Sequence, residues 1–376
     1  MNTPKKLGFL WAYSLPLVIV GTYWIGGPAW TWAAVGYTFV VIPILDGLFG
    51  RDPRNLDQPG YDAALSDRYF DVLVYSYVYI HVALLLWGAY VLTFEPLTGW
   101  QQTGLILSIG LVAGTVINAA HELGHRSSRV AQRHAQGALV LVSYGHFMIE
   151  HNRGHHVHVA TPLDPATARK NQSVYAFWKQ SIAGGYRSAW RIETDLLAKE
   201  TRLVWSRHNR MLWFGLLPVL LATLLTAGFS AWAGHVVWLI PLFFVGQSAI
   251  GILLLECINY IEHYGIIRRE LPRVAGEPVR YERVNPLHSW NASERISNYV
   301  LFQLQRHSDH HAYASRPYQV LRHFDQSPQL PGGYPAMILL ALVPPLWFAV
   351  LNPRLERWQQ RACQPAEIAA AVRQFA

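Results

Sequence analysis

The chain has few charged residues and very few cysteines. Only 14% of its 376 residues are charged, whereas 52% are hydrophobic. The two cysteines, Cys257 and Cys363, lie far apart, which excludes a disulfide framework and a cysteine-based metal site. There is no GxGxxG nucleotide-binding loop, no internal repeat and no low-complexity linker. We therefore expect one domain over residues 1–376 that carries neither a disulfide scaffold nor a dinucleotide-binding unit of its own.

Long uncharged runs predict an integral membrane protein. Each is long enough, or nearly so, to cross roughly 30 Å of hydrocarbon as a helix. The six runs are residues 7–25, 31–45, 72–94, 103–120, 211–233 and 236–255. The second is the shortest, and Asp46 follows its end. A seventh run, residues 334–351, is split by Pro344 and Pro345, which is typical of an interfacial or re-entrant helix.

The basic residues predict how the spans are oriented. All 31 Lys and Arg lie at the amino terminus, between spans two and three, between spans four and five, or after span six. This positive-inside pattern predicts six spans with both termini in the cytoplasm. Lys5 and Lys6 precede an apolar run without a cleavage signal, which indicates a retained anchor. The net charge of +8 favours contact with anionic membrane lipid, leaves room for an acidic protein partner, and does not lead us to expect nucleic acid.

Four histidine motifs lie on the predicted cytoplasmic side. They are HELGH with His121 and His125, EHNRGHH with His151, His155 and His156, NYIEHYG with His263, and LQRHSDHHAY with His307, His310 and His311. Helix residues three or four apart share a face, so each multi-histidine motif can direct two imidazoles at one point. Adjacent histidines point about 100° apart. We therefore expect neighbouring histidines to serve different metal ions.

The number of candidate ligands favours a two-metal centre. Nine histidines exceed the four positions of one tetrahedral zinc ion. Two iron ions with open positions for oxygen fit the count better, although the nitrogen-rich set does not by itself exclude copper or nickel. His81, inside the third run, is expected to face protein or a cavity. The other histidines are not assigned to metal: His134, His208, His288 and His323 are expected to be solvated, His146 and His158 flank the second motif, and His235 lies across the membrane.

HELGH is also a literal HExxH, the helix of zinc proteases. The LDG at residues 45–47 is similar to the aspartate motif of intramembrane zinc proteases, but that motif follows HExxH in those enzymes and precedes it here. A protease would also leave seven clustered histidines unused. Glu122 is therefore better interpreted as a carboxylate that orients a ligand imidazole. Glu150, Glu262 and Asp309 are further candidates for that role.

Together with ATPLDPATAR, LHSWN and LPGGYP, these motifs resemble the membrane-bound alkane 1-monooxygenases, the non-haem di-iron alkane hydroxylases. The resemblance covers nearly the whole chain. The three multi-histidine motifs alone are shared with membrane fatty-acid desaturases and xylene-type hydroxylases, whereas NYIEHYG is a sharper signature and makes His263 an expected ligand. Ile266, where relatives often carry leucine, is a small departure that affects no candidate ligand.

The resemblance implies an all-α membrane fold with six transmembrane helices and a cytoplasmic histidine-rich helical cap that holds two iron ions. It also implies O₂-dependent terminal hydroxylation of medium- or long-chain n-alkanes to primary alcohols in the bacterial inner membrane. Electrons would come from rubredoxin, reduced by an NAD(P)H-dependent rubredoxin reductase. The sequence is consistent with a separate electron donor, because it has no four-cysteine rubredoxin site.

Two alternatives remain open. The closer one is a fatty-acyl desaturase or hydroxylase with the same di-iron core. The other, a metal transporter or store, is disfavoured because we find no carboxylate at mid-membrane to relay a cation.

The fourth run offers a candidate substrate path. Gly110, Gly114 and Ile117 share one helix face with His121. Such a small-residue face is typical of helix packing, but it also fits a groove for an alkyl chain. Ile252, Leu255 and Asn259 form the matching approach to His263 on the sixth run.

Overall fold

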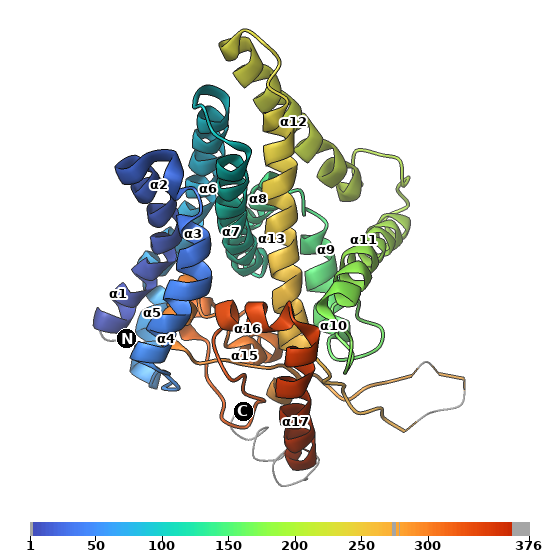
Figure 1. Ribbon diagram of the computed structural model, residues 1–376. Coiled ribbons are helices and arrows are strands. Elements are labelled where there is room, and N and C mark those ends of the chain that lie inside the picture. Colours follow the sequence, from blue (N-terminus) through green and yellow to red (C-terminus); the bar gives the residue numbers. More distant parts are fainter. Residues whose placement is uncertain (1–2, 273–275, 278, 363–376) are drawn as a thin grey trace.

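The computed structural model describes residues 3–272, 276–277 and 279–362, which are largely helical (Figure 1). Within these residues the only β-type pairings are isolated bridges, such as the one between Arg51 and Glu294, so the all-α prediction is confirmed. Five helices are long and apolar enough to cross a membrane, or six if one sharply bent helix pair is counted as a span.

The full-length spans agree with five of the six predicted runs. The first is the helical segment Lys5–Trp30, which includes α1 (Thr3–Gly8), η1 (Phe9–Tyr13), α2 (Ser14–Gly26) and η2 (Gly27–Trp30). The others are α6 (Arg68–Phe94), α7 (Gly99–Gly124), α12 (Arg210–Ala233) and α13 (Leu239–His263). Side-chain caps begin three of them: Asp67 accepts from Tyr69 N, Thr98 forms a capping box with Gln101, and Asn209 accepts from Met211 N. Each such cap contributes about 1 kcal/mol.

The second predicted span is shorter than the others. It lies in the helical segment Ala33–Phe49, formed by α3 (Ala33–Gly36), the π-helical η3 (Tyr37–Val41) and α4 (Ile42–Phe49). At 1.5 Å per residue it reaches only about 25 Å. Its Asp46 is buried and accepts from the backbone N–H groups of Ile296 (2.9 Å) and Ser297 (3.0 Å), at the start of α14 (Arg295–Val300). Asp46 therefore anchors the start of α14.

The seventh run forms the bent pair. The helix direction bends by 119° between α16 (Tyr334–Ala341) and α17 (Pro344–Ala362), as expected from Pro344 and Pro345. Both pack beside the end of α13, where Tyr334 and Trp347 are fully buried.

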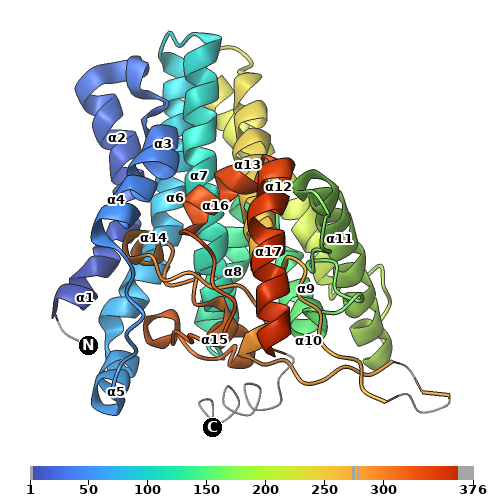
Figure 2. The same ribbon diagram turned by 60° about the horizontal axis from the view of Figure 1, so that its bottom comes forward.

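A helical cap gathers at one end of the spans (Figure 2). It contains α5 (Gln58–Ser66), α9 (Phe147–Glu150), η4 (His151–His155), α10 (His156–His158), η5 (Pro286–His288), α14, α15 (His307–Ala312) and η6 (Tyr318–Val320). Helices α8 (Arg129–Leu141) and α11 (Val174–Lys199) flank the bundle. Helix α7 lies at the centre and α12 at the periphery: 78% of the most apolar stretch of α7 is buried, against 11% for α12. The bundle therefore fixes α7 and α13 firmly, and both helices end at the cap.

Candidate metal centre

The structure brings all nine candidate histidines together where α7 and α13 meet the cap. They form two groups, and within each group the candidate ligand atoms lie within 4.8 Å of one another. The five-histidine group is His121, His125, His151, His156 and His310, and the four-histidine group is His155, His263, His307 and His311. All are buried except His125 and His156, which are half-buried. The adjacent pairs His155–His156 and His310–His311 are each divided between the two groups.

In the five-histidine group the Nε2 atoms face one another. The Nε2 atoms of His121 and His310 lie 2.9 Å apart, and those of His125 and His151 lie 3.1 Å apart. The Nε2 atoms of His156 and His310 lie 3.2 Å apart. Two nitrogens that are each about 2.1 Å from one ion, at right angles, lie about 3.0 Å apart. The spacing therefore fits nitrogen ligands of a single metal ion.

The four-histidine group has the same character. The Nε2 atoms of His307 and His311 lie 2.9 Å apart, and those of His155 and His311 lie 3.3 Å apart. The ring of His263 lies 4.9 Å from the rings of His155 and His311, between centroids. Among the described residues, neither ring nitrogen of His263 has a hydrogen-bond partner, although the side chain is fully buried. A buried polar group normally has a partner, so His263 fits a metal ligand.

A π-helical turn explains the division of the second motif. His151 faces His156, five residues on, with 3.0 Å between the Nε2 atoms, whereas His155 belongs to the other group. The segment η4 is a π-helix, so side chains five residues apart come onto one face. The α-helical rule of four residues predicts the pairs His121–His125 and His307–His311 but not this one.

The surroundings keep most of these imidazoles neutral. Burial and neighbouring imidazoles hold the pKa of His151, His156 and His310 well below the usual value, and the same causes act on His307 and His311. Burial, together with His155, lowers the pKa of His125 to about 4. Metal binding requires the unprotonated nitrogen, so the free protein already holds the form that binds metal.

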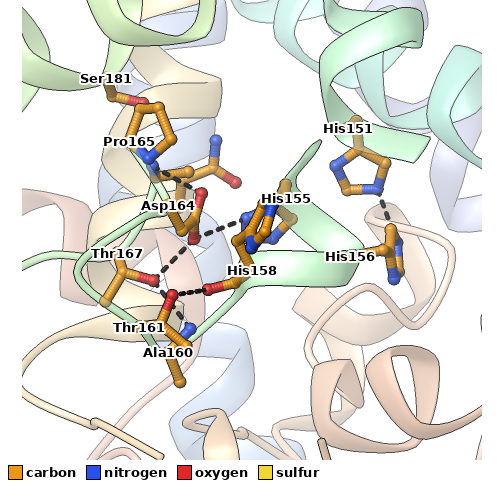
Figure 3. Close-up of polar contacts among 12 residues, drawn as sticks. His151, His155, His156, His158, Ala160, Thr161, Asp164, Pro165, Thr167 and Ser181 are labelled. Carbon is orange, nitrogen blue, oxygen red and sulfur yellow. Dashed lines mark hydrogen bonds and ion pairs between the residues drawn. The ribbon is translucent and has the colours of Figure 1, made fainter. Parts of the chain in front are cut away.

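Asp164 holds the ring of His155 (Figure 3). Its Oδ2 lies 2.9 Å from His155 Nδ1 and also accepts from the Thr167 hydroxyl at 2.6 Å, while Oδ1 accepts from Ala166 N at 3.0 Å. Burial opposes a charge on His155, but the Asp164 carboxylate, together with the nearby Glu150 and Glu256, raises the pKa of His155. With Nδ1 held by a carboxylate, Nε2 is left to face the other histidines.

Asp164 lies in the ATPLDPATAR motif and is not among the carboxylates predicted from the sequence. The signal was available, because an Asp followed two and three residues later by its own hydrogen-bond donors is typical of a turn that fixes the carboxylate.

Glu262 is the one predicted carboxylate that contacts a candidate ligand. Its Oε2 lies 3.1 Å from His307 Nε2, the nitrogen that also faces His311, and its Oε1 accepts from the Tyr334 hydroxyl at 2.7 Å. The carboxylate therefore lies on the ligand side of the His307 ring, and Tyr334 fixes its position.

Glu122 and Asp309 differ from expectation. Glu122 pairs with Arg126 at 3.3 Å, and Asp309 pairs with Arg316 (2.5 Å) and Arg322 (3.2 Å). Glu122 directly follows His121, and Asp309 directly precedes His310. On a helix each carboxylate therefore points about 100° away from the neighbouring ligand. In the described structure their partners are arginines and not histidines.

A small polar cavity borders both groups. It measures about 10 Å³, which is room for about one water molecule, and His151, His155, Glu150, Glu256 and Asn259 are among its lining residues. Burial, reinforced by Asp164, raises the pKa of Glu150 to about 8, and among the described residues its Oε1 has no partner.

Glu256 is not among the carboxylates predicted from the sequence. It accepts from the Tyr144 hydroxyl (2.6 Å), from Ser181 and from Asn259 (3.2 Å). It lies about 10 Å before the end of α13, too near the cap to act as a mid-membrane relay.

Two of the histidines outside the metal groups differ from the prediction. His288 is buried against Glu282, and His323 is buried with its Nδ1 2.7 Å from the Ser293 hydroxyl, although both were expected to be solvated. His81 is fully buried inside α6, as predicted, and His235 is exposed at the far end of α12.

The candidate channel residues separate into different environments. Gly114 and Leu255 line an apolar cavity that also reaches Asn118 and Tyr334. Gly110 instead packs against α13, because a Cβ there would lie 2.6 Å from Ile250. The remaining three do not line this cavity: Ile117 is fully buried in the core, Ile252 packs against that core, and Asn259 lines the small polar cavity.

The chain is similar to known enzymes over most of its length. The fatty acid desaturase family model matches residues 98–341. Alkane 1-monooxygenase 1 of Pseudomonas aeruginosa is 44% identical over 94% of this chain and 90% of its own length. Alkane 1-monooxygenase 2 of Alcanivorax borkumensis is 41% identical over 95% and 92%. The hydroxylase component of xylene/toluene monooxygenase from Pseudomonas putida is 27% identical over 94% and 91%.

The match therefore covers the spans and the cap together, at an identity that is higher for the alkane enzymes than for the xylene/toluene enzyme. The chain belongs to the alkane 1-monooxygenase family, within the larger fatty acid desaturase-like family.

Proposed function

We propose that the nine histidines hold two iron ions and that the chain hydroxylates the terminal methyl group of medium- or long-chain n-alkanes. The balanced reaction is RH + O₂ + 2 e⁻ + 2 H⁺ → ROH + H₂O. The observation that carries the proposal is the convergence of all nine histidines into two groups. Two iron ions would supply the activation of O₂ that attack on an unactivated C–H bond requires, which no side chain provides.

The protein's own contribution is to hold neutral ligands in fixed directions. Asp164 orients His155, and Tyr334 positions Glu262 beside His307. Such supporting groups affect metal affinity or activity by about 10–100-fold. A neutral histidine set also leaves the charge of the metal uncancelled.

The apolar cavity supports a role in positioning the alkane. It lies among α4, α7, α13 and α16, and Gly114 and Leu255 line it. It reaches Tyr334, whose hydroxyl bonds the Glu262 carboxylate beside His307. An alkane has no polar handle, so the shape of such a cavity must set which carbon reaches the metal. Apolar walls also keep water away from the reacting end.

The electron donor and orientation are further parts of the proposal. Family membership implies an external donor, and we propose rubredoxin, reduced by its NAD(P)H-dependent reductase. The basic residues on the cap side support a cytoplasmic cap in the bacterial inner membrane. Arg153 and Lys170 lie in the cap near the second motif, and Arg153 is exposed there.

Product analysis tests this function against its closest alternative. Purified protein, loaded with iron and supplied with rubredoxin, reductase, NADH and an n-alkane, is expected to release the primary alcohol. An alkene or a modified acyl chain, formed from a fatty-acyl substrate in preference to an alkane, would instead identify a desaturase or acyl hydroxylase.

A further inference from the structure

Two grooves flank the loosely packed span α12. The first, between α12 and α13, has a volume of about 800 Å³, and the second, between α8 and α12, about 570 Å³. Both volumes lie in the range typical of small-molecule and lipid sites, about 300–1,000 Å³. Because α12 is so little buried, what fills these grooves affects how firmly the helix is held.

The α8/α12 groove has a basic end and an apolar body. Arg133 and Gln136 on α8, with Arg210 and Trp213 on α12, line one end. The rest is lined by side chains that include a row of leucines from Leu217 to Leu224 on α12. Arg210 begins a membrane span at its cap end, so the leucines lie deeper along the span than the arginines. A basic end above an apolar body matches an anionic headgroup with an acyl chain.

The two arginines differ in what already binds them. Arg210 is held by the buried carboxylate of Glu193, with 2.5 Å between Nη2 and Oε2. Arg133 is exposed, and no ion pair or hydrogen bond engages its guanidinium in the part of the chain that the structure describes. The groove therefore presents one unneutralised cation at its headgroup end.

The groove also has room beside the arginine. Gly137 lies four residues after Arg133, on the same face of α8, and lines the groove. A Cβ added at Gly137 would meet no atom within 4 Å. A larger residue there would fill the groove without displacing protein atoms.

We propose that the α8/α12 groove binds one anionic glycerophospholipid, with its phosphate at Arg133 and one acyl chain along the leucine row. The lipid would hold α12 against the bundle near the metal centre. At its start α12 packs beside α9: Met211 is buried with Ile149, two residues before His151, and Phe214 covers Gly145. Loss of the lipid would loosen the helix that supports the second histidine motif.

The α12/α13 groove provides a comparison within the same molecule. It is the larger of the two, but no Lys or Arg is among its described lining residues. It therefore suits neutral chains and gives no reason to prefer an anionic lipid. Gly215 lines it, and a Cβ at Gly215 would also meet no atom within 4 Å. Gly137→Leu and Gly215→Leu thus form a matched pair, each filling one groove.

The experiment measures lipid binding and stability on full-length protein in detergent. Native mass spectrometry counts retained phospholipid, and thermal unfolding follows addition of phosphatidylglycerol, phosphatidylcholine or inorganic phosphate. We expect phosphatidylglycerol alone to raise the Tm. Arg133→Gln should weaken its binding about five-fold, the usual effect of one basic residue at a membrane surface. Gly137→Leu should abolish the Tm rise, whereas Gly215→Leu should retain it.

Three results would overturn the proposal. They are equal stabilisation by phosphatidylcholine, an unchanged response in Arg133→Gln, and a loss in Gly215→Leu as large as that in Gly137→Leu. A response to inorganic phosphate equal to that of the lipid would assign the arginine to free anions and reject the acyl-chain part. Arg133→Gln changes only an exposed side chain, so it remains decisive if a leucine variant fails to fold.

Discussion

The Nδ1 atom of His155 lies 2.9 Å from the Oδ2 atom of Asp164, inside a loop whose own backbone holds the carboxylate in place. Both side chains are buried, so the pair is screened little by solvent or salt. Asp164 thereby determines which nitrogen of His155 is available to a metal ion.

Replacing Asp164 with Asn should lower iron affinity and hydroxylation about 10–100-fold, because the ring of His155 loses its charged carboxylate acceptor. Iron content is measured by elemental analysis and turnover by alcohol formation. Asp195→Asn, on the exposed face of α11, is the control and should change neither. Full iron and normal turnover in the Asp164 variant would show that the loop alone positions His155.

Replacing His307 with Ala should lower the iron content and abolish hydroxylation, since His307 belongs to the four-histidine group. Elemental analysis and alcohol formation provide the two measurements. His235→Ala should be nearly silent, because that side chain is exposed at the opposite end of the spans. A His307 variant that kept two irons per chain would refute the nine-ligand proposal.

Charge reversal at Arg153 should raise the apparent KM for rubredoxin more than the KM for alkane, if an acidic donor docks on the cap. Turnover at limiting donor should also fall with salt, because exposed charges are screened over about 8 Å at physiological ionic strength. Steady-state kinetics at several salt concentrations provide the measurement. Donor kinetics independent of salt would leave these charges with a topological role only.

Replacing Gly114 with Leu should shift the substrate preference toward shorter alkanes. A Cβ at Gly114 would lie 3.3 Å from the Leu254 side chain, which must shift by a few tenths of an ångström, and the larger side chain would narrow the apolar cavity. Product profiles across a series of chain lengths test this. Gly110→Leu is the contrasting variant and should reduce folding yield, since a Cβ there meets Ile250 at 2.6 Å. An unchanged profile in folded Gly114→Leu would place the alkane elsewhere.

The metal-free protein should lose stability as the pH falls from about 6.5 to 4. Six candidate ligands outside the spans have lowered pKa values, namely His125, His151, His156, His307, His310 and His311. The unfolded chain protonates these histidines near pH 6.5 and therefore binds more protons in this window. Glu150, whose pKa is raised to about 8, acts in the opposite sense within this window but is a single group, and the raised pKa of His155 has its effect above pH 6.5.

Thermal unfolding of chelator-treated protein at several pH values measures this effect. Replacing His307 with Gln should flatten the dependence, because one group that titrates differently in the two states is removed. A Tm that rises on acidification through this window would contradict the assignment of neutral histidines.

Hydropathy predicted six spans, five of which are full-length helices in the structure, and proline spacing predicted the bent helix at Pro344, because these features depend on local composition. The spacing of the histidines also singled out those that meet in the cap. The division into five and four was not predictable in full, since the π-turn at His151–His155 changes the spacing rule and leaves no mark in the sequence. The arginine partner of Glu122 was not predicted for a different reason. On a helix a residue next to a ligand faces away from it, and the prediction for Glu122 did not take this into account.

The distance along the chain between the ligands has a consequence for biogenesis. His121 and His310 meet across 189 residues, and each histidine group takes members from both 151–156 and 307–311. Neither group is complete until residues 307–311 have been synthesised and have folded against the inserted spans. Because a metal site rarely exists before its ligands are assembled, we expect metal loading to be a late event that follows membrane insertion. A ribosome-bound chain that ends before residue 307 should be inserted in the membrane without metal.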